Sequence, residues 1–239
     1  MDMNKLYQVE SRTGQKFYCR PNTFDEGIIR GYIDDYSDVI ANIHADETWL
    51  DIGAHIGGFT AAIAQRAKRV VAIEADPETT EVLKLNVVQF PNVEVVSAAV
   101  VGRKPVPLLD GEHDTVSFYQ SVGGKFGAQN AQGSLLNVRG RKSIEVPYVL
   151  FEDLVEKEEN VCVKMDIEGG EREILDSMRC WSSIRRFLLE YHRSQLCDMG
   201  LDYYRQIIYR FQHNFKLDTI TTTMNESAEQ WSCYIYGAK

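Results

Sequence analysis

Two carboxylates and a lysine stand close together in one apolar stretch of the sequence. Val161–Met165 has the composition of a buried strand interrupted only by Lys164, and Asp166 and Glu168 follow where that strand would end. A carboxylate there can orient a hydroxyl group or accept its proton, and a buried ammonium can keep the carboxylate charged. An acidic helix N-terminus in solvent is the alternative, but it does not explain the buried lysine.

A glycine turn earlier in the chain could bind a nucleotide. Trp49–Ile52 reads as a short buried strand, and Phe59–Ala67 reads as a helix. Gly53 and Gly57 lie in the turn between them, where the absence of side chains lets the backbone approach a ligand. The unit therefore predicts either a nucleotide site or, as the alternative, a tight structural corner without a ligand.

Two residues of this unit indicate which nucleotide. A dinucleotide fingerprint would have glycine where this chain has His55. The carboxylate of Asp51, two residues before the first glycine, would repel a pyrophosphate and attract a cation. The pattern therefore predicts S-adenosylmethionine (SAM), whose methionine part carries an ammonium group, in preference to NAD.

The next strand supports this cofactor. Arg69–Glu74 is an apolar run ending in an acid, and Glu74 follows the first glycine by about 20 residues, the spacing at which an acid binds ribose hydroxyls. Small residues near Ala98, at the end of a third strand, leave room for an adenine ring. The residues predicted to bind the cofactor are Asp51, Gly53, Ala54, His55, Gly57, Phe59, Thr60, Glu74, Ala75 and Ala98.

The topology of an open α/β sheet would bring both groups of residues together. Ligands bind outside the carboxyl ends of the strands, where the strand order reverses. If the strand 161–165 lies beside the strand 49–52, Asp166 faces the same crevice as Gly53. A fifth strand, 187–192, places a histidine at the same edge as an alternative base. The candidate catalytic residues are Asp166, Glu168, Lys164 and His192.

The remaining segments are predicted to complete one domain and its additions. Residues 1–44 form a hairpin and a helical cap, and residues 45–239 form the main domain. Residues 93–100 form the third strand, and 143–149 an edge strand, because Pro147 cannot donate to a ladder. A glycine-rich loop near 121–140 is expected to cover the acceptor. Further candidates for acceptor contacts are Tyr32, Asp34, Asp35, Tyr36, His113, Ser117 and Ser134.

Composition limits the class of protein. The 239 residues are 44% hydrophobic, which suits one α/β domain. A net charge of −9 argues against a nucleic-acid partner, which needs a basic face. Five scattered cysteines without metal-binding spacing predict reduced thiols and a cytoplasmic protein. No apolar run is long enough for a membrane span, no signal peptide is evident, and the oligomeric state is left open.

Three stretches resemble the FkbM family of SAM-dependent methyltransferases. They are residues 50–60 around the glycine turn, residues 74–77, and the Lys-x-Asp-x-Glu-Gly-x-Glu stretch at 164–171. The last is the most specific, since the glycine turn alone indicates only a class I methyltransferase. The resemblance covers roughly residues 25–192. His55 departs from it, because the family usually has asparagine there.

The resemblance implies a fold and an activity. The fold is α/β, a Rossmann-like class I methyltransferase with a seven-stranded, mostly parallel sheet, an antiparallel last strand and helices on both faces. The activity is methyl transfer to a hydroxyl of a sugar, glycan or polyketide-like small molecule. A divalent metal could join the two carboxylates to the acceptor, although nothing in the sequence requires it. A methyltransferase for RNA caps or tRNA and a non-catalytic SAM-binding module are the alternatives.

Overall fold

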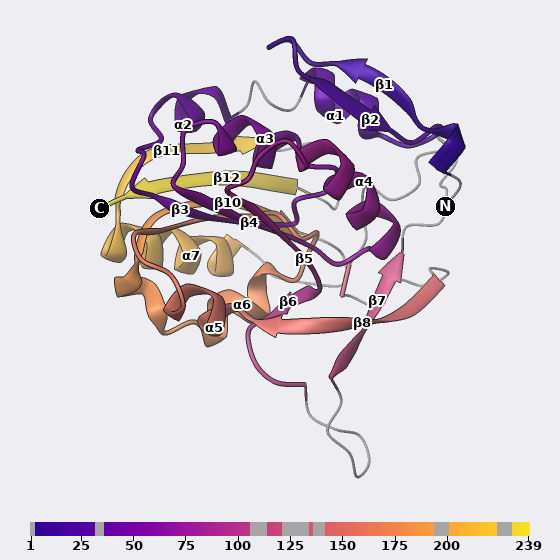
Figure 1. The fold of residues 1–239 in the computed structure, drawn as a ribbon. Coiled ribbons are helices and arrows are strands. Elements are labelled where there is room, and N and C mark those ends of the chain that lie inside the picture. Colours follow the sequence, from indigo (N-terminus) through magenta and orange to yellow (C-terminus); the bar gives the residue numbers. More distant parts are fainter. Residues whose placement is uncertain are drawn as a thin grey trace.

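A seven-stranded sheet forms the centre of the molecule, with the strand order β11-β12-β10-β9-β3-β4-β5 (Figure 1). The computed structural model describes residues 3–31, 36–105, 114–120, 134–135, 142–193, 201–223 and 231–239. The strands of this sheet are β3 (Thr48–Ile52), β4 (Arg69–Glu74), β5 (Val93–Ser97), β9 (Val161–Met165), β10 (Ile184–Arg193), β11 (Lys216–Thr223) and β12 (Trp231–Ala238).

The strand directions confirm the predicted fold. The strands β10, β9, β3, β4 and β5 run parallel, and β12 runs antiparallel to β10 and β11 as the reversed last strand. Every position of β3 and β9 is buried, which explains their nearly continuous apolar sequences. The chain leaves β3 toward β4 on one side and returns to β9 on the other. The carboxyl ends of β3 and β9 therefore form the expected crevice.

Helices cover both faces of the sheet, as predicted (Figure 1). On one face, Phe59 and Ile63 pack with Trp49 and Val70 of the sheet. The opposite face buries a larger cluster, in which the rings of Phe187 and Phe211 lie 5.2 Å apart. No helix in the described part of the chain is long and apolar enough to cross a membrane. The α-helices are α1 (Asp25–Gly31), α2 (Ser37–Ala41), α3 (Gly58–Ala64), α4 (Pro77–Val87), α5 (Phe151–Glu156), α6 (Glu171–Ser177) and α7 (Leu201–Asn214).

The predicted third strand, 93–100, is divided between two sheets. The strand β5 ends at Ser97, and the N–H of Ala98 donates to the carbonyl of Glu74 at 3.1 Å. The chain then enters a separate three-stranded sheet with the order β6-β8-β7. Its strands are β6 (Ala99–Val101), β7 (Thr115–Gln120) and β8 (Lys142–Leu150). The sequence reads as one continuous strand because both parts are apolar.

The prediction of an edge strand at 143–149 is wrong. β8 is the central strand of the small sheet, antiparallel to β7 and parallel to β6. Pro147 pairs with Thr115 at the end of β7, and pairing with β6 begins only at Tyr148. The proline therefore lies where one partner ends and the other begins, so its missing N–H does not interrupt a ladder on both sides.

An N-terminal hairpin packs against α4 and the glycine turn (Figure 1). Its strands, β1 (Tyr7–Glu10) and β2 (Lys16–Cys19), pair antiparallel as predicted. The side-chain amide of Asn86 on α4 accepts from the N–H of Tyr18 at 2.7 Å and donates to its carbonyl at 3.0 Å. This amide extends the hairpin's backbone hydrogen bonding to α4. Two short 3-10 helices, Met3–Lys5 and Cys180–Ser183, complete the described elements.

Candidate active site

The turn between β3 and α3 lies against the ends of the two strands that flank β3, which are β4 on one side and β9 on the other. Gly53 has φ +81° and Gly57 has φ +92°, a region that glycine enters without steric cost. The N–H groups of Gly53 and Ala54 both donate to the carbonyl of Ile73 on β4, at 3.0 Å. A Cβ atom on Gly53 would lie 1.8 Å from the carbonyl oxygen of Asp166. The backbones of the turn and of the β9 end therefore approach too closely for a side chain here.

Glu74 ends β4 beside this turn. Its two carboxylate oxygens accept hydrogen bonds from the backbone N–H groups of His55, at 3.0 Å, and Asp76, at 2.9 Å. Burial raises the pKa of Glu74 to about 7, against the lowering effect of these two N–H groups. Ala75 follows in the chain, and Ala98 binds the carbonyl of Glu74 from the next strand. Glu74 is therefore a partly buried carboxylate whose charge changes near neutral pH.

Lys164 joins the carboxyl ends of β3 and β9. Its Nζ donates to the carbonyl of Gly53 at 2.8 Å and lies 3.4 Å from Asp51 Oδ1 and 3.6 Å from Asp166 Oδ2. Burial lowers the pKa of Lys164, but the carboxylates of Asp51 and Asp166 raise it above its ordinary value. Thr60 Oγ1 donates to the other oxygen of Asp51, at 2.5 Å. The structure thus brings Lys164 together with Asp166, one of the two acids predicted beside it, and with Asp51, which was predicted to bind the cofactor.

Glu190 is a buried acid beside this cluster that the sequence analysis missed. It lies on β10 and accepts a hydrogen bond from the hydroxyl of Tyr36, one of the predicted candidates, at 3.3 Å. After burial, which lowers the pKa of Lys164, Glu190 is a third carboxylate that raises it. The signal was present in the sequence, because Glu190 interrupts an apolar strand as Lys164 does.

The loop after β9 is fixed by a carboxylate of its own. Glu171 is fully buried, and its side chain accepts from two N–H groups of the loop, at 3.1 and 2.8 Å. The N–H of Asp166 donates to the carbonyl of Ile52 at 3.0 Å. Glu168 has φ +57°, and its carbonyl accepts from Ser134 Oγ at 2.8 Å. These contacts fix the backbone of the loop that carries Asp166 and Glu168.

Other residues that were predicted for the site either make contacts away from Lys164 or lie outside the described part of the chain. The ring of Phe59 packs edge-on against the rings of Tyr36 and Trp49. Ser117 is exposed and donates to Glu145 at 2.7 Å. His192 pairs with Ser232 in the sheet, and its side chain lies outside the described residues. Also outside them are Tyr32, Asp34, Asp35, His113 and residues 121–133 and 136–140 of the predicted flap.

The site fits the cofactor predicted from the sequence. The carboxylate of Glu74 lies at the end of β4 and follows Gly53 by about 20 residues, the spacing at which an acid binds ribose hydroxyls. A glycine turn lies between β3 and α3. One oxygen of Asp51, Oδ1, is buried and lies 3.4 Å from the ammonium of Lys164 without forming a hydrogen bond in the described structure, so its hydrogen-bonding capacity is unfilled. Within the described residues, no group of three or more His, Cys, Asp or Glu side chains could hold a metal ion. The fold and the site define a class I SAM-dependent methyltransferase.

Comparison with protein families gives the more specific assignment. The model of the methyltransferase FkbM domain matches residues 51–217, and the chain belongs to this family. The match begins at Asp51, contains the glycine turn, Glu74 and the Lys164–Glu171 stretch, and ends after α7.

Curated relatives match a shorter part of the chain. The probable ribosomal RNA small subunit methyltransferase A of Methanosarcina acetivorans is 37% identical over 84 residues, which are 34% of this chain and 31% of that protein. The ribosomal RNA small subunit methyltransferase A of Alkaliphilus metalliredigens is 32% identical over 95 residues, 40% of this chain and 30% of that protein. The chain therefore spans only about 30% of the length of these relatives.

Solved structures share the fold over nearly the whole chain. Trm5b from Pyrococcus abyssi has a TM-score of 0.55 and 13% identity, covering 98% of this chain and 56% of that one. M. jannaschii TYW2, solved in complex with AdoMet, has a TM-score of 0.51 and 17% identity, covering 98% and 85%. These similarities confirm the class I fold.

The prediction that nucleic acid is not a partner is wrong. It rested on the net charge of −9, whereas the curated relatives are named as ribosomal RNA methyltransferases. Net charge is a sum over the whole surface, and a few local basic groups are enough to contact phosphates. An acidic total therefore does not exclude a nucleic-acid acceptor.

Proposed function

We propose that this SAM-dependent methyltransferase transfers a methyl group to RNA. The observation that carries the choice of acceptor is the sequence similarity to ribosomal RNA methyltransferases, at 37% and 32% identity. The crevice geometry supports the transfer itself, because Lys164 holds Asp51 and Asp166 within 3.4 and 3.6 Å of one ammonium. The proposal applies to RNA as a class of acceptor.

The cofactor-binding roles follow from the contacts around the turn. Glu74 would accept hydrogen bonds from the two ribose hydroxyls, and Gly53 and Gly57 would leave room for the methionine part. Asp51 would accept from the cofactor's ammonium. The remaining predicted cofactor residues, Ala54, His55, Phe59, Thr60, Ala75 and Ala98, would shape or support this site.

SAM binding is expected to weaken as the pH falls from 8 to 6. Glu74 must be ionised to accept both ribose hydroxyls, and burial raises its pKa to about 7. At pH 6 only about a tenth of the protein would hold the ionised form, so the apparent dissociation constant should rise about ten-fold. Calorimetry at the two pH values measures this change.

Glu74→Gln is the control for this prediction. The variant should bind SAM weakly and with little dependence on pH, and any dependence that remains belongs to the ligand or to other groups. Equal affinity of the wild-type protein at pH 6 and pH 8 would contradict the ribose role of Glu74.

Asp166 is proposed as the group that accepts the acceptor's proton. When bound, SAM supplies an electrophilic methyl group on a sulfonium. Asp51, Gly53, Gly57 and Glu74 would hold SAM, and the carboxylate of Asp166 would take the acceptor's proton as the acceptor receives that methyl group. Lys164 stabilises the charge on Asp166, and Glu168 lies two residues away on the same loop. His192 remains the alternative base.

Methylation of a hydroxyl on a sugar, glycan or polyketide-like molecule is the second candidate function. The observation in its favour is the partly exposed Asp166 carboxylate beside an ammonium, 3.6 Å away, which suits hydroxyl deprotonation. An RNA ribose hydroxyl would use the same chemistry. The acceptor class must therefore be tested directly.

Labelled SAM with separate RNA and glycan fractions tests both candidates. We expect label in RNA, recovered in nucleosides after digestion. Asp166→Asn should retain SAM binding and lose about 10²–10⁴-fold in turnover, the usual contribution of a general base. Asp153→Asn, which changes an exposed carboxylate on α5, is the matched control and should behave like wild type.

Three other results would change the assignment. Label in glycans or small molecules but not in RNA would overturn the RNA proposal in favour of the second candidate. SAM binding without transfer to either class would indicate a non-catalytic binding module. Full turnover in Asp166→Asn would remove Asp166 from the mechanism and leave His192 to be tested.

We also propose a cytoplasmic location and the division into residues 1–44 and 45–239. Cys19, Cys162 and Cys180 are buried free thiols, as expected of a reducing compartment. Burial raises the pKa of Cys19 to about 12 and of Cys180 to about 11, so both are neutral and unreactive at physiological pH.

A further inference from the structure

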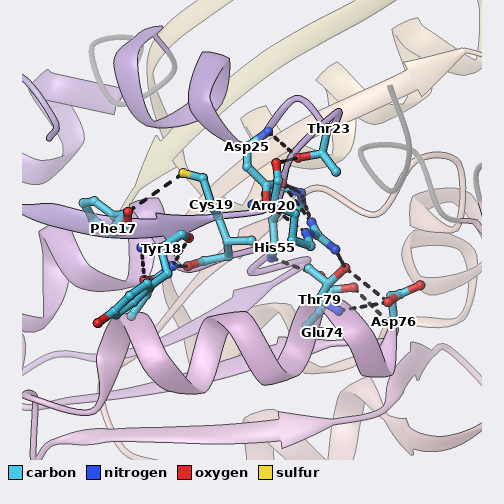
Figure 2. A network of polar contacts seen from close by, with 12 residues as sticks. Phe17, Tyr18, Cys19, Arg20, Thr23, Asp25, His55, Glu74, Asp76 and Thr79 are labelled. Carbon is cyan, nitrogen blue, oxygen red and sulfur yellow. Dashed lines mark hydrogen bonds and ion pairs between the residues drawn. The ribbon is translucent and has the colours of Figure 1, made fainter. Parts of the chain in front are cut away.

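Arg20 connects the N-terminal hairpin to the cofactor site. It follows β2, is only 4% exposed, and forms a bidentate pair with the buried carboxylate of Asp25 at the start of α1, at 2.9 and 2.8 Å (Figure 2). Its guanidinium also reaches Thr79 Oγ1, at 2.7 Å, and His55 Nε2, at 3.2 Å. One buried side chain therefore contacts α1, α4 and the glycine turn.

Arg20 contacts His55 and Thr79 in addition to Asp25. Each of these two contacts continues through further hydrogen bonds to one carboxylate oxygen of Glu74. On one side, Arg20 contacts the ring of His55, whose φ is +51° and whose N–H donates to Glu74 Oε2 at 3.0 Å. A non-glycine residue with this φ needs support from its surroundings. The ring supplies that support, because Nε2 also lies 3.4 Å from Asp25 Oδ1.

On the other side, the connection runs through the start of α4. Thr79 Oγ1 accepts from Arg20 and donates to Asp76 Oδ1 at 3.2 Å, and Asp76 also accepts from the N–H of Thr79 as the helix N-cap. The N–H of Asp76 then donates to Glu74 Oε1 at 2.9 Å. Figure 2 shows both connections converging on Glu74.

We propose that Arg20 is a positioning residue of the cofactor site, which orients Glu74 for the ribose through His55 on one side and through Thr79 and Asp76 on the other. This inference rests on the proposed role of Glu74 as the ribose ligand. It makes the N-terminal hairpin part of the cofactor site, although the hairpin lies outside the residues that match the family model.

The charges around Glu74 support the same role. Burial raises the pKa of Glu74, the carboxylate of Asp76 adds to this effect, and the charge of Arg20 opposes it. His55 and Asp25 are the other titratable groups of the network. Arg20 therefore also favours the ionised form of Glu74, which is the form that accepts two hydroxyl hydrogen bonds.

Arg20→Gln should weaken SAM binding and shift its pH dependence. We expect a dissociation constant about ten-fold higher at pH 8, equivalent to about 1.4 kcal/mol, and a midpoint of the pH profile displaced to higher pH. The measurement is calorimetry of the full chain with SAM between pH 6 and 9. Arg30→Ala is the matched control, because it removes an exposed ion pair of α1 and should bind SAM like wild type.

Two further variants separate positioning from general stability. Thr79→Val keeps the pair of Arg20 with Asp25 and removes only the hydroxyl link, so it should weaken SAM binding in the same direction even if Arg20→Gln does not fold. In a Glu74→Gln background, the effect of Arg20→Gln should disappear, because contacts that act through one residue are not additive.

The results distinguish this inference from the proposal on which it rests. Folded Arg20→Gln or Thr79→Val protein that binds SAM with wild-type affinity and pH midpoint would overturn the inference alone. An Arg20→Gln effect of equal size in the Glu74→Gln background would also overturn it. Wild-type protein that does not bind SAM would overturn the proposed cofactor-binding role of Glu74, and the inference with it.

Discussion

Gly53→Ala is expected to abolish measurable SAM binding. The added Cβ would lie 1.8 Å from the carbonyl oxygen of Asp166 and 2.9 Å from its carbonyl carbon, and both are backbone atoms. Alanine would also have to adopt φ +81°, which is strained for any residue with a side chain. The turn and the end of β9 must therefore separate. Their separation displaces the two carboxylates that flank Lys164.

The expected loss of SAM affinity is at least about a hundred-fold, or about 2.7 kcal/mol. Calorimetry gives the affinity, and circular dichroism shows whether the protein remains folded. Gly27→Ala is the matched control: a Cβ on Gly27 in α1 has no atom within 4 Å, and alanine should stabilise a helix by about 0.5–1 kcal/mol. Wild-type affinity in folded Gly53→Ala protein would show that the turn does not bind SAM.

Lys164→Met should destabilise the fold more than any other single charge removal at the crevice. Methionine nearly matches the length of the lysine stem but leaves the fully buried Asp51 and the nearby Asp166 without an ammonium. Breaking a buried ion pair by removing one partner costs about 3–5 kcal/mol. Urea denaturation at pH 7 measures the loss.

The loss should be fully present at neutral pH. The pKa of Lys164 is raised in the folded protein, so the stability that its ammonium contributes is complete below its ordinary pKa and is lost only as the pH rises through the raised value. The control is Lys84→Met on α4, an exposed lysine paired with Glu81, which should change stability by less than about 1 kcal/mol. A similar small effect of Lys164→Met would contradict the ionic role of the cluster.

Much of the fold and part of the site could be predicted from the sequence. The strand, glycine turn and helix at 49–67 combine apolar periodicity with required glycines, and both signals are local. The placement of Asp166 at the same crevice as Gly53 was predicted from the topology of parallel sheets, whereas the contact of Lys164 with Asp51 was not predicted. Glu171 was noted only as part of a motif, and its action on its own loop depends on hydrogen bonds that no pattern of residue types describes.

The contacts that could not be predicted join distant segments without a motif. Arg20 meets His55 and Thr79 because the hairpin docks on α4, and neither spacing nor composition indicates that docking. Ser134 meets Glu168 through the second sheet. The central position of β8 was missed because a proline usually marks an edge, and the exception depends on where two partner strands end.

The insertion of β12 between β10 and β11 has a consequence for synthesis on the ribosome. Translation delivers β10 and β11 before β12, yet the hydrogen-bonding edge of β10 that faces away from β9 belongs to β12. Until residues 231–238 emerge, that edge is an open template for strands of other chains. Nascent protein that has just completed β11 is therefore the species most dependent on chaperones, and slower translation of β12 should increase aggregation.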